Sequence, residues 1–119
     1  MKPTPVKRIL IVVAVLLTLL LLMSSLAQAV QVTDDRGRVV KLAKPPERIV
    51  SLLPSLAETV CALGACQRLV GVDRYTNWPD SVKQLPQVGG GLDPNIEAVV
   101  ALRPDVVLMA TSSRAADRL

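Results

Sequence analysis

Three short apolar runs, at residues 48–53, 69–72 and 106–109, constrain the fold of this chain most strongly. Glycine, proline or polar residues bound each run, which is typical of strands buried on both faces of a sheet. Helix signals occupy the stretches between the runs. This alternation predicts an α/β fold with a mainly parallel sheet and right-handed crossovers. We therefore expect a parallel-sheet α/β sandwich lobe of the Rossmann-like type.

The first expected helix follows the run at 48–53. Ser55-x-x-Glu58 fits a capping box at its start, and Gly64 suits a left-handed conformation at its end. Its apolar side chains recur on one helix face, namely Leu56, Val60 and Leu63.

A second helix is expected before the run at 106–109. Either Asp93 or Asn95 provides its cap, and Pro94 suits its first turn. Its predicted buried stripe consists of Ile96, Val99 and Val100. Residues 111–113 look like the start of another helix, and the sequence ends at Leu119 about two turns later.

The residues before the first apolar run predict an export signal and a small hairpin. Lys2, Lys7 and Arg8 precede an apolar run at 9–23, and Ala27-Gln28-Ala29 follows it. This pattern is typical of a secretory signal peptide over residues 1–29, cleaved after Ala29. The run of 15 residues is shorter than the roughly 20 that span a bilayer, which argues against an uncleaved anchor. The exported part is then residues 30–119, opening with a hairpin of strands at 30–33 and 38–42.

Charge and composition exclude several classes of function. The chain has 14 Lys and Arg against 10 Asp and Glu, and three of the basic residues lie in the signal peptide. The exported part is therefore nearly neutral, which gives no reason to expect nucleic-acid binding. No histidine is present, so the commonest metal ligand and the usual general base are missing. We expect no enzyme activity, metal site or cofactor.

Cys61 and Cys66 are the two cysteines of the chain. An exported destination is oxidising and permits a disulfide between them. Their spacing differs from the C-x-x-C of redox enzymes, which favours a structural staple at a helix end over a catalytic thiol.

Candidate ligand-binding residues follow the predicted strands, because ligands of parallel sheets lie off the carboxyl ends of the strands. Three loops are expected there: Pro54-Ser55, residues 73–79 and residues 110–113. The loop at 73–79 holds Tyr75 and Trp78, the only large aromatic residues of the chain. Gly89-Gly90-Gly91 reads as a flexible loop without the features of a phosphate-binding motif.

Several segments in fixed order resemble a known family. They are Thr33-Asp-Asp-Arg-Gly-Arg-Val-Val-Lys-Leu, Arg48-Ile-Val-Ser-Leu-Leu-Pro-Ser-Leu-Ala-Glu-Thr-Val-Cys-Ala-Leu-Gly, Leu69-Val-Gly-Val-Asp and Ile96-Glu-Ala-Val-Val-Ala-Leu-Arg-Pro-Asp-Val-Val-Leu. Together they are similar to the periplasmic substrate-binding proteins of ABC importers for iron–siderophore complexes, haem and vitamin B12. The resemblance covers essentially all of residues 31–119.

The resemblance implies a function in import and a partner. Such proteins clasp a ligand between two α/β lobes joined by a long helix, and glutamates at the lobe tips dock on the permease. Tyr75 and Trp78 match the loop that lines the ligand cleft, and Glu97 matches the docking glutamate of the N-terminal lobe. The expected partners are an inner-membrane ABC permease and a corrinoid or ferric chelate, and the expected location is the periplasm.

Two departures from the family pattern bear on these expectations. The sequence ends where the connecting helix should begin, so the C-terminal lobe is expected to be absent from a truncated product. Cobalamin binders can place a Trp where this chain has Gly89-Gly90-Gly91, which weakens the vitamin B12 assignment. Two alternatives stay open: a small exported disulfide-containing redox or structural protein, and a membrane-anchored sensor lobe.

Overall fold

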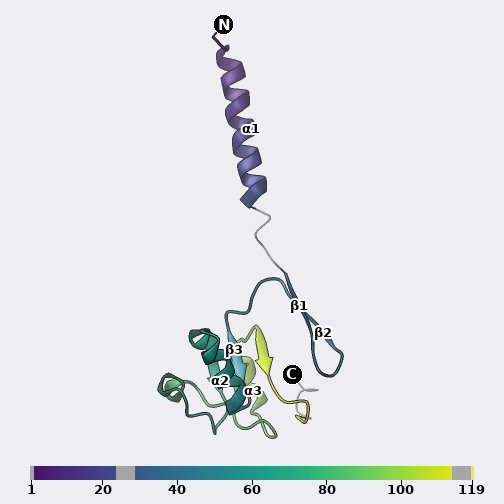
Figure 1. Ribbon diagram of the computed structural model, residues 1–119, viewed down its shortest axis with the longest axis vertical. Helices are drawn as coiled ribbons and strands as arrows, with labels where there is room; N and C mark the ends of the chain where they lie inside the picture. Colours follow the sequence, from purple (N-terminus) through teal and green to yellow (C-terminus); the bar gives the residue numbers. More distant parts are fainter. Residues whose placement is uncertain (1, 24–28, 114–118) are drawn as a thin grey trace.

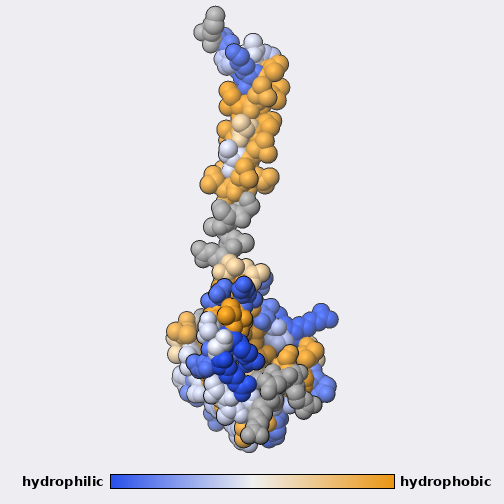
Figure 2. Space-filling view, turned by 90° about the vertical axis from the view of Figure 1, so that its right-hand side faces the viewer, coloured by the Kyte–Doolittle hydropathy of each residue, from blue (hydrophilic) through white to orange (hydrophobic). Residues whose placement is uncertain are grey.

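The computed structural model describes residues 2–23, 29–113 and 119 of the chain. Its first element is helix α1, Pro5–Met23, which is 19 residues long and buries none of its side chains. Figure 2 shows apolar side chains along α1 beyond the basic residues at its start. The helix is long and apolar enough to cross a membrane, a test that signal sequences also pass. The helix begins at Pro5, four residues before the apolar run, so its length is compatible with both a signal peptide and a membrane anchor.

The predicted hairpin is confirmed. Strands β1, Val30–Thr33, and β2, Val39–Leu42, pair antiparallel, with Val32 opposite Val40. The Asp34 carboxylate accepts hydrogen bonds from the backbone N–H groups of Arg36 and Arg38, at 2.9 and 2.7 Å. Gly37 adopts a φ of 77°, which glycine tolerates without strain, and the turn closes with the Asp34 N–H donating to the Arg38 carbonyl at 2.9 Å.

The three apolar runs form one parallel sheet, as predicted. Strand β3, Ile49–Ser51, lies in the centre and is buried along its whole length. Strand β4, Leu69–Val72, pairs with one edge of β3, and β5, Val106–Leu108, pairs with the other. Both pairings are parallel, so the three strands all end at the same edge of the sheet.

Helices α2, Pro54–Ala62, and α3, Ile96–Ala101, cover opposite faces of the sheet (Figure 1). On the α2 face, Ile49 packs in a cluster with Ala57, Val60, Leu69, Val72 and Val82. On the α3 face, Val50 packs with Leu52, Val88 and Val99. Short 3-10 helices at Cys66–Arg68 and Asp80–Gln84 complete the α2 side. The predicted α/β sandwich is therefore confirmed.

The predicted start of α2 was wrong. The helix begins at Pro54, with Leu53 as its cap and no side-chain hydrogen bond there. Proline suits the first helical position because its fixed φ is already helical, so Ser55 lies inside the helix and forms no capping box. Leu63 is 79% exposed because it follows the last helical residue, and Gly64 ends the helix with a φ of 79°, as predicted.

The start of α3 distinguishes between the two predicted caps. The Asn95 side chain accepts the backbone N–H of Ala98 at 2.9 Å, and Pro94 precedes the cap instead of opening the helix. Val99 is buried, but Val100 is 62% exposed, because a helix of six residues turns only a narrow face to the sheet. Residues 110–113 form a turn, and the helix expected to start there falls on residues 114–118, which lie outside the described part of the chain.

A disulfide joins Cys61, in the last turn of α2, to Cys66, in the short helix before β4. Both cysteines pack against the cluster on the α2 face, and the Cys66 sulfur lies 3.6 Å from the Ser81 hydroxyl. The bridge therefore links α2 to the segment leading into β4, as expected of a structural staple.

Asp105 fastens the beginning of β5 to the beginning of β3. Its carboxylate accepts the backbone N–H groups of Glu47 and Arg48 at 2.8 and 2.9 Å. These two donors hold the pKa of the Asp105 carboxyl below its ordinary value, because they stabilise its charged form.

We predict that Asp105→Asn lowers the free energy of unfolding at pH 7, because the charged acceptor is lost. A carboxyl whose pKa is lower in the folded chain stabilises the fold above its unfolded pKa, about 4, and loses this effect as pH falls through the folded pKa. The difference between wild type and variant should therefore shrink below pH 4. Urea unfolding across that range measures it, with Asp80→Asn as the exposed control. Equal stability of wild type and Asp105→Asn at pH 7 would contradict a stabilising role for the Asp105 hydrogen bonds to Glu47 and Arg48.

Candidate ligand-binding face

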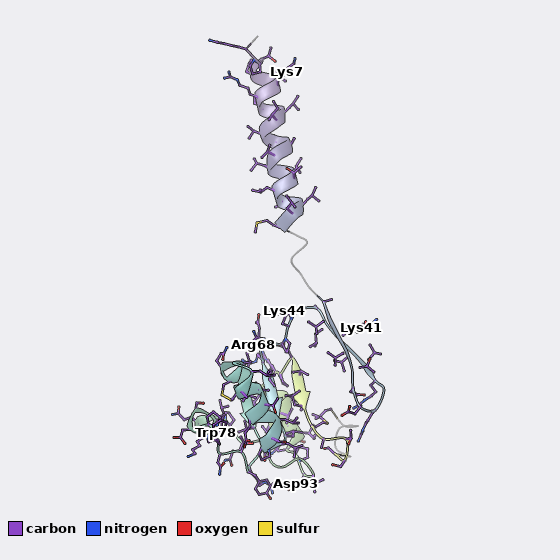
Figure 3. The ribbon with its side chains drawn as sticks, in the orientation of Figure 1. Lys7, Lys41, Lys44, Arg68, Trp78 and Asp93 are labelled. Carbon is purple, nitrogen blue, oxygen red and sulfur yellow. A yellow bond between two sulfur atoms is a disulfide. The ribbon has the colours of Figure 1, made fainter. Side chains whose placement is uncertain are left out.

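The three loops that follow the strands lie at one edge of the sheet, because β3, β4 and β5 are parallel. We call this edge the ligand face; it comprises those three loops, at 53–55, 73–79 and 110–113, and the loop at 89–93 that is hydrogen-bonded to two of them. In Figure 3, Trp78 and Asp93 lie toward one end of the lobe, whereas Lys44 and Arg68 lie toward the other. Arg68 immediately precedes β4 and Trp78 follows it, in agreement with the direction of the strand.

The two aromatic residues point outward from the loop after β4. Tyr75 is 67% exposed and Trp78 is 58% exposed. Beneath them, the buried Asp73 carboxylate accepts the backbone N–H of Tyr75 at 3.0 Å and the hydroxyl of Thr76. The loop is therefore held from below by a buried polar contact while its rings remain available to a ligand.

An ion pair links this loop to the loop at 89–93. The Arg74 guanidinium lies 2.7 Å from the Asp93 carboxylate and 5.7 Å from the centre of the Tyr75 ring. The Asp93 carboxylate raises the pKa of Arg74, chiefly through the hydrogen bond between them. The pair is exposed, so its contribution to stability is small, but it places a cation beside an aromatic ring.

The glycine loop, Gly89-Gly90-Gly91, is packed closely, in contrast to the flexible loop that the sequence suggested. A Cβ atom at Gly89 would lie 2.7 Å from the Asp93 carbonyl oxygen, and one at Gly91 would lie 2.9 Å from the Leu52 carbonyl oxygen. The backbone N–H of Arg74 donates to the Gly89 carbonyl at 2.7 Å. Glycines are therefore needed here for close approach of the backbone.

The other predicted site residues lie at the starts of the two helices. Pro54 is half-buried and Ser55 is exposed, in the first turn of α2 directly after β3. Glu97 is exposed in the first turn of α3. Because β5 starts at the opposite edge, α3 also begins on the side of the ligand face.

Sequence reasoning singled out the aromatic residues but not the polar residues that hold their loop. Asp73 and Arg74 gave no signal beyond their place in a polar loop, and Asp93 was considered only as a helix cap. The ion pair gave no local signal because Arg74 and Asp93 are 19 residues apart in sequence. Within residues 2–23, 29–113 and 119, no group of three or more His, Cys, Asp or Glu is placed to hold a metal ion.

A parallel sheet with helices on both faces defines an α/β lobe, and its carboxyl edge carries an aromatic loop. Residues 49–119 match the family described as periplasmic binding protein. The chain therefore belongs to that family.

Similar proteins share this assignment. The uncharacterised ABC transporter substrate-binding lipoprotein YvrC of Bacillus subtilis is 39% identical over 87 residues, covering 73% of this chain and 27% of that protein. The vitamin B12-binding protein of Yersinia pestis is 39% identical over 66 residues, covering 56% of this chain and 24% of that protein. The chain thus spans about a quarter of the length of these curated relatives.

Solved structures show the same fold. A periplasmic haem-binding protein from Pseudomonas aeruginosa is 48% identical with a TM-score of 0.52, over 53% of this chain and 23% of that one. The iron uptake ABC transporter substrate-binding protein PiuA from Streptococcus pneumoniae is 30% identical with a TM-score of 0.66, over 77% of this chain and 34% of that one. These relatives are named for binding and import.

Proposed function

We propose that residues 30–119 form a ligand-binding lobe of an ABC importer, and that its ligand is a corrinoid, haem or a ferric siderophore. The observation that carries the proposal is the exposure of Tyr75 and Trp78 on the ligand face of a chain that belongs to the periplasmic binding protein family. The names of the relatives, which include vitamin B12, haem and iron uptake, supply the range of ligands.

The chemistry of the face suits a large, chelated metal complex. Aromatic side chains offer much contact area with few rotatable bonds, so they bind bulky flat ligands at little entropic cost. A chelator already fills most coordination sites of its metal, so such a ligand needs at most an axial protein ligand. Pro54 and Ser55, at the end of β3, would extend the contact surface beside Tyr75 and Trp78.

One lobe offers a single wall to a ligand. Ligand sites commonly bury most of a small molecule, about 70–90% of its surface, which needs a second surface opposite the ligand face. We propose that tight binding requires a second lobe opposite this one.

The position of the disulfide argues for a structural role and against a redox role. Cys61 and Cys66 join neighbouring elements of the core, and the relatives are named for binding. We therefore favour a structural bridge, formed in an oxidising compartment, over a catalytic dithiol.

We predict that Tyr75 contributes directly to ligand affinity. In a chimera with residues 49–119 in place of the matching part of the vitamin B12-binding protein of Yersinia pestis, Tyr75→Ala should weaken ligand binding about tenfold. Titration with cyanocobalamin, haem and ferric enterobactin measures the affinity and identifies the ligand class. Leu63→Ala, at the far end of α2 and 79% exposed, is the matched control.

Two results would contradict this part of the proposal. The first is a chimera that binds none of the three ligands although the parent protein binds cyanocobalamin. The second is saturable, tight binding by residues 30–119 alone, which would refute the need for a second wall.

We propose that Glu97 docks the lobe on an inner-membrane permease. Its carboxylate is exposed in the first turn of α3, where it also complements the positive end of the helix. Glu97→Gln in the same chimera should leave ligand affinity unchanged and reduce stimulation of the permease-bound ATPase severalfold, because an ion pair is lost. Glu58→Gln, on α2, is the control. Normal stimulation with Glu97→Gln would exclude the docking role.

We propose that the lobe reaches the periplasm and that residues 1–29 are removed. Helix α1 starts with Lys7 and Arg8 in its first turn, and its apolar remainder precedes Ala29, as in signal peptides. N-terminal sequencing of the protein recovered from the periplasm should begin at Val30. Recovery in the membrane fraction with α1 intact would favour the anchored alternative, which the length of α1 also allows.

A further inference from the structure

The β1–β2 hairpin needs support from outside its own ladder. It forms a separate two-stranded sheet, and Val32 and Val39 are 55% and 53% exposed. An isolated two-stranded hairpin is marginally stable in water. In Figure 1 the hairpin turn lies beside the segment that follows β5.

The hairpin turn presents one arginine to that segment. Asp34 organises the turn by accepting the backbone N–H groups of Arg36 and Arg38 and the Arg38 guanidinium, the last at 2.9 Å. Arg38 is thus engaged within the turn, whereas the Arg36 side chain reaches the loop after β5. Two arginines of one turn therefore have different partners.

The Arg36 guanidinium bridges two carbonyl groups of the loop at 110–113. It donates to the Thr111 carbonyl and, at 3.3 Å, to the Ser113 carbonyl, which are 75 and 77 residues away in sequence. A planar guanidinium suits this arrangement because its donors have a fixed geometry.

The contact continues to the glycine loop. The Ser113 side chain is 1% exposed, and its hydroxyl donates to the Gly91 carbonyl at 2.6 Å. The glycine loop in turn accepts the backbone N–H of Arg74 at Gly89 and leads into Asp93, the partner of the Arg74 guanidinium. Arg74 lies beside Tyr75.

We propose that Arg36 is a positioning residue of the ligand face, acting through Ser113 and the glycine loop on Arg74 and Tyr75. The hairpin then serves as a strap, meaning that its contacts fix the position of the loop after β5 relative to the loop after β4. The link to ligand affinity rests on the proposed function, because preorganised loops bind with a smaller entropic cost. The effect of Arg36 on the order of the loops is independent of the proposed function.

Amide hydrogen exchange on the full chain in lipid nanodiscs tests the strap. In Arg36→Gln, exchange at the amides of Arg74, Asn95 and Ser113 should accelerate about tenfold, because charged hydrogen bonds that close the loops are lost. Arg38→Gln is the matched control in the same turn and should leave these three amides unchanged. Arg36→Lys keeps a charged donor on a shorter side chain, so its exchange rates should fall between those of wild type and Arg36→Gln.

A second variant separates positioning from simple loss of the hairpin. Ser113→Ala removes the hydroxyl that reaches Gly91 and leaves the hairpin contacts of Arg36 to backbone carbonyls in place. Exchange should then accelerate at Arg74 and Asn95, while the ladder amides of residues 30–42 keep wild-type rates. Acceleration confined to the hairpin in Arg36→Gln, or unchanged rates at Arg74 and Asn95 in both variants, would overturn the proposal.

Ligand titration distinguishes this inference from the proposed function. Placed in the chimera extended to residues 30–119, Arg36→Gln should weaken binding of the ligand by about tenfold and Arg38→Gln should not. A chimera that binds no ligand refutes the proposed function, and the exchange rates still decide the strap. Ligand binding by the chimera with equal affinity in Arg36→Gln overturns the positioning role.

Discussion

The parallel pairing of β3 with both β4 and β5 is the interaction on which the rest of the lobe depends. It places Ile49 and Val50, which are neighbours in sequence, in hydrophobic clusters on opposite faces of the sheet. Each cluster in turn fixes one helix. The same pairing brings the ends of three strands to one edge, so the loops that carry polar and aromatic residues converge without any local signal for convergence.

The ligand face combines exposed rings with buried anchors. Tyr75 and Trp78 face outward, whereas Asp73, Thr76 and Ser113 are buried and hydrogen-bonded beneath the surface. Among the described residues, no buried side-chain nitrogen or oxygen is left without a hydrogen-bond partner. These buried hydrogen bonds hold the loops of the face in place. The close approach of the glycine loop to Leu52 and Asp93 serves the same end.

Much of the fold was predictable because local patterns decide it. Apolar runs bounded by breakers gave β3, β4 and β5, and the Asp-Asp-Arg-Gly turn gave the hairpin. Gly64 was predictable because only a residue that tolerates positive φ ends a helix in this way. The predicted capping box at Ser55 was wrong because the helix begins at Pro54. The local sequence is compatible with a helix start at either residue. The predicted burial of Val100 was wrong because the length of α3, which sets the width of its buried face, depends on the packing around the helix.

The sequence by itself determined the α/β class, the hairpin, the apolar α1 and the aromatic loop of the candidate site. Each of these depends on residues within a few positions of one another, where periodicity and turn chemistry act directly. Only the tertiary structure decided the contacts of Arg74 with Asp93, of Ser113 with Gly91 and of Arg36 with the loop after β5. Their partners are 19 to 77 residues apart, so they meet only because the sheet brings the loop ends together.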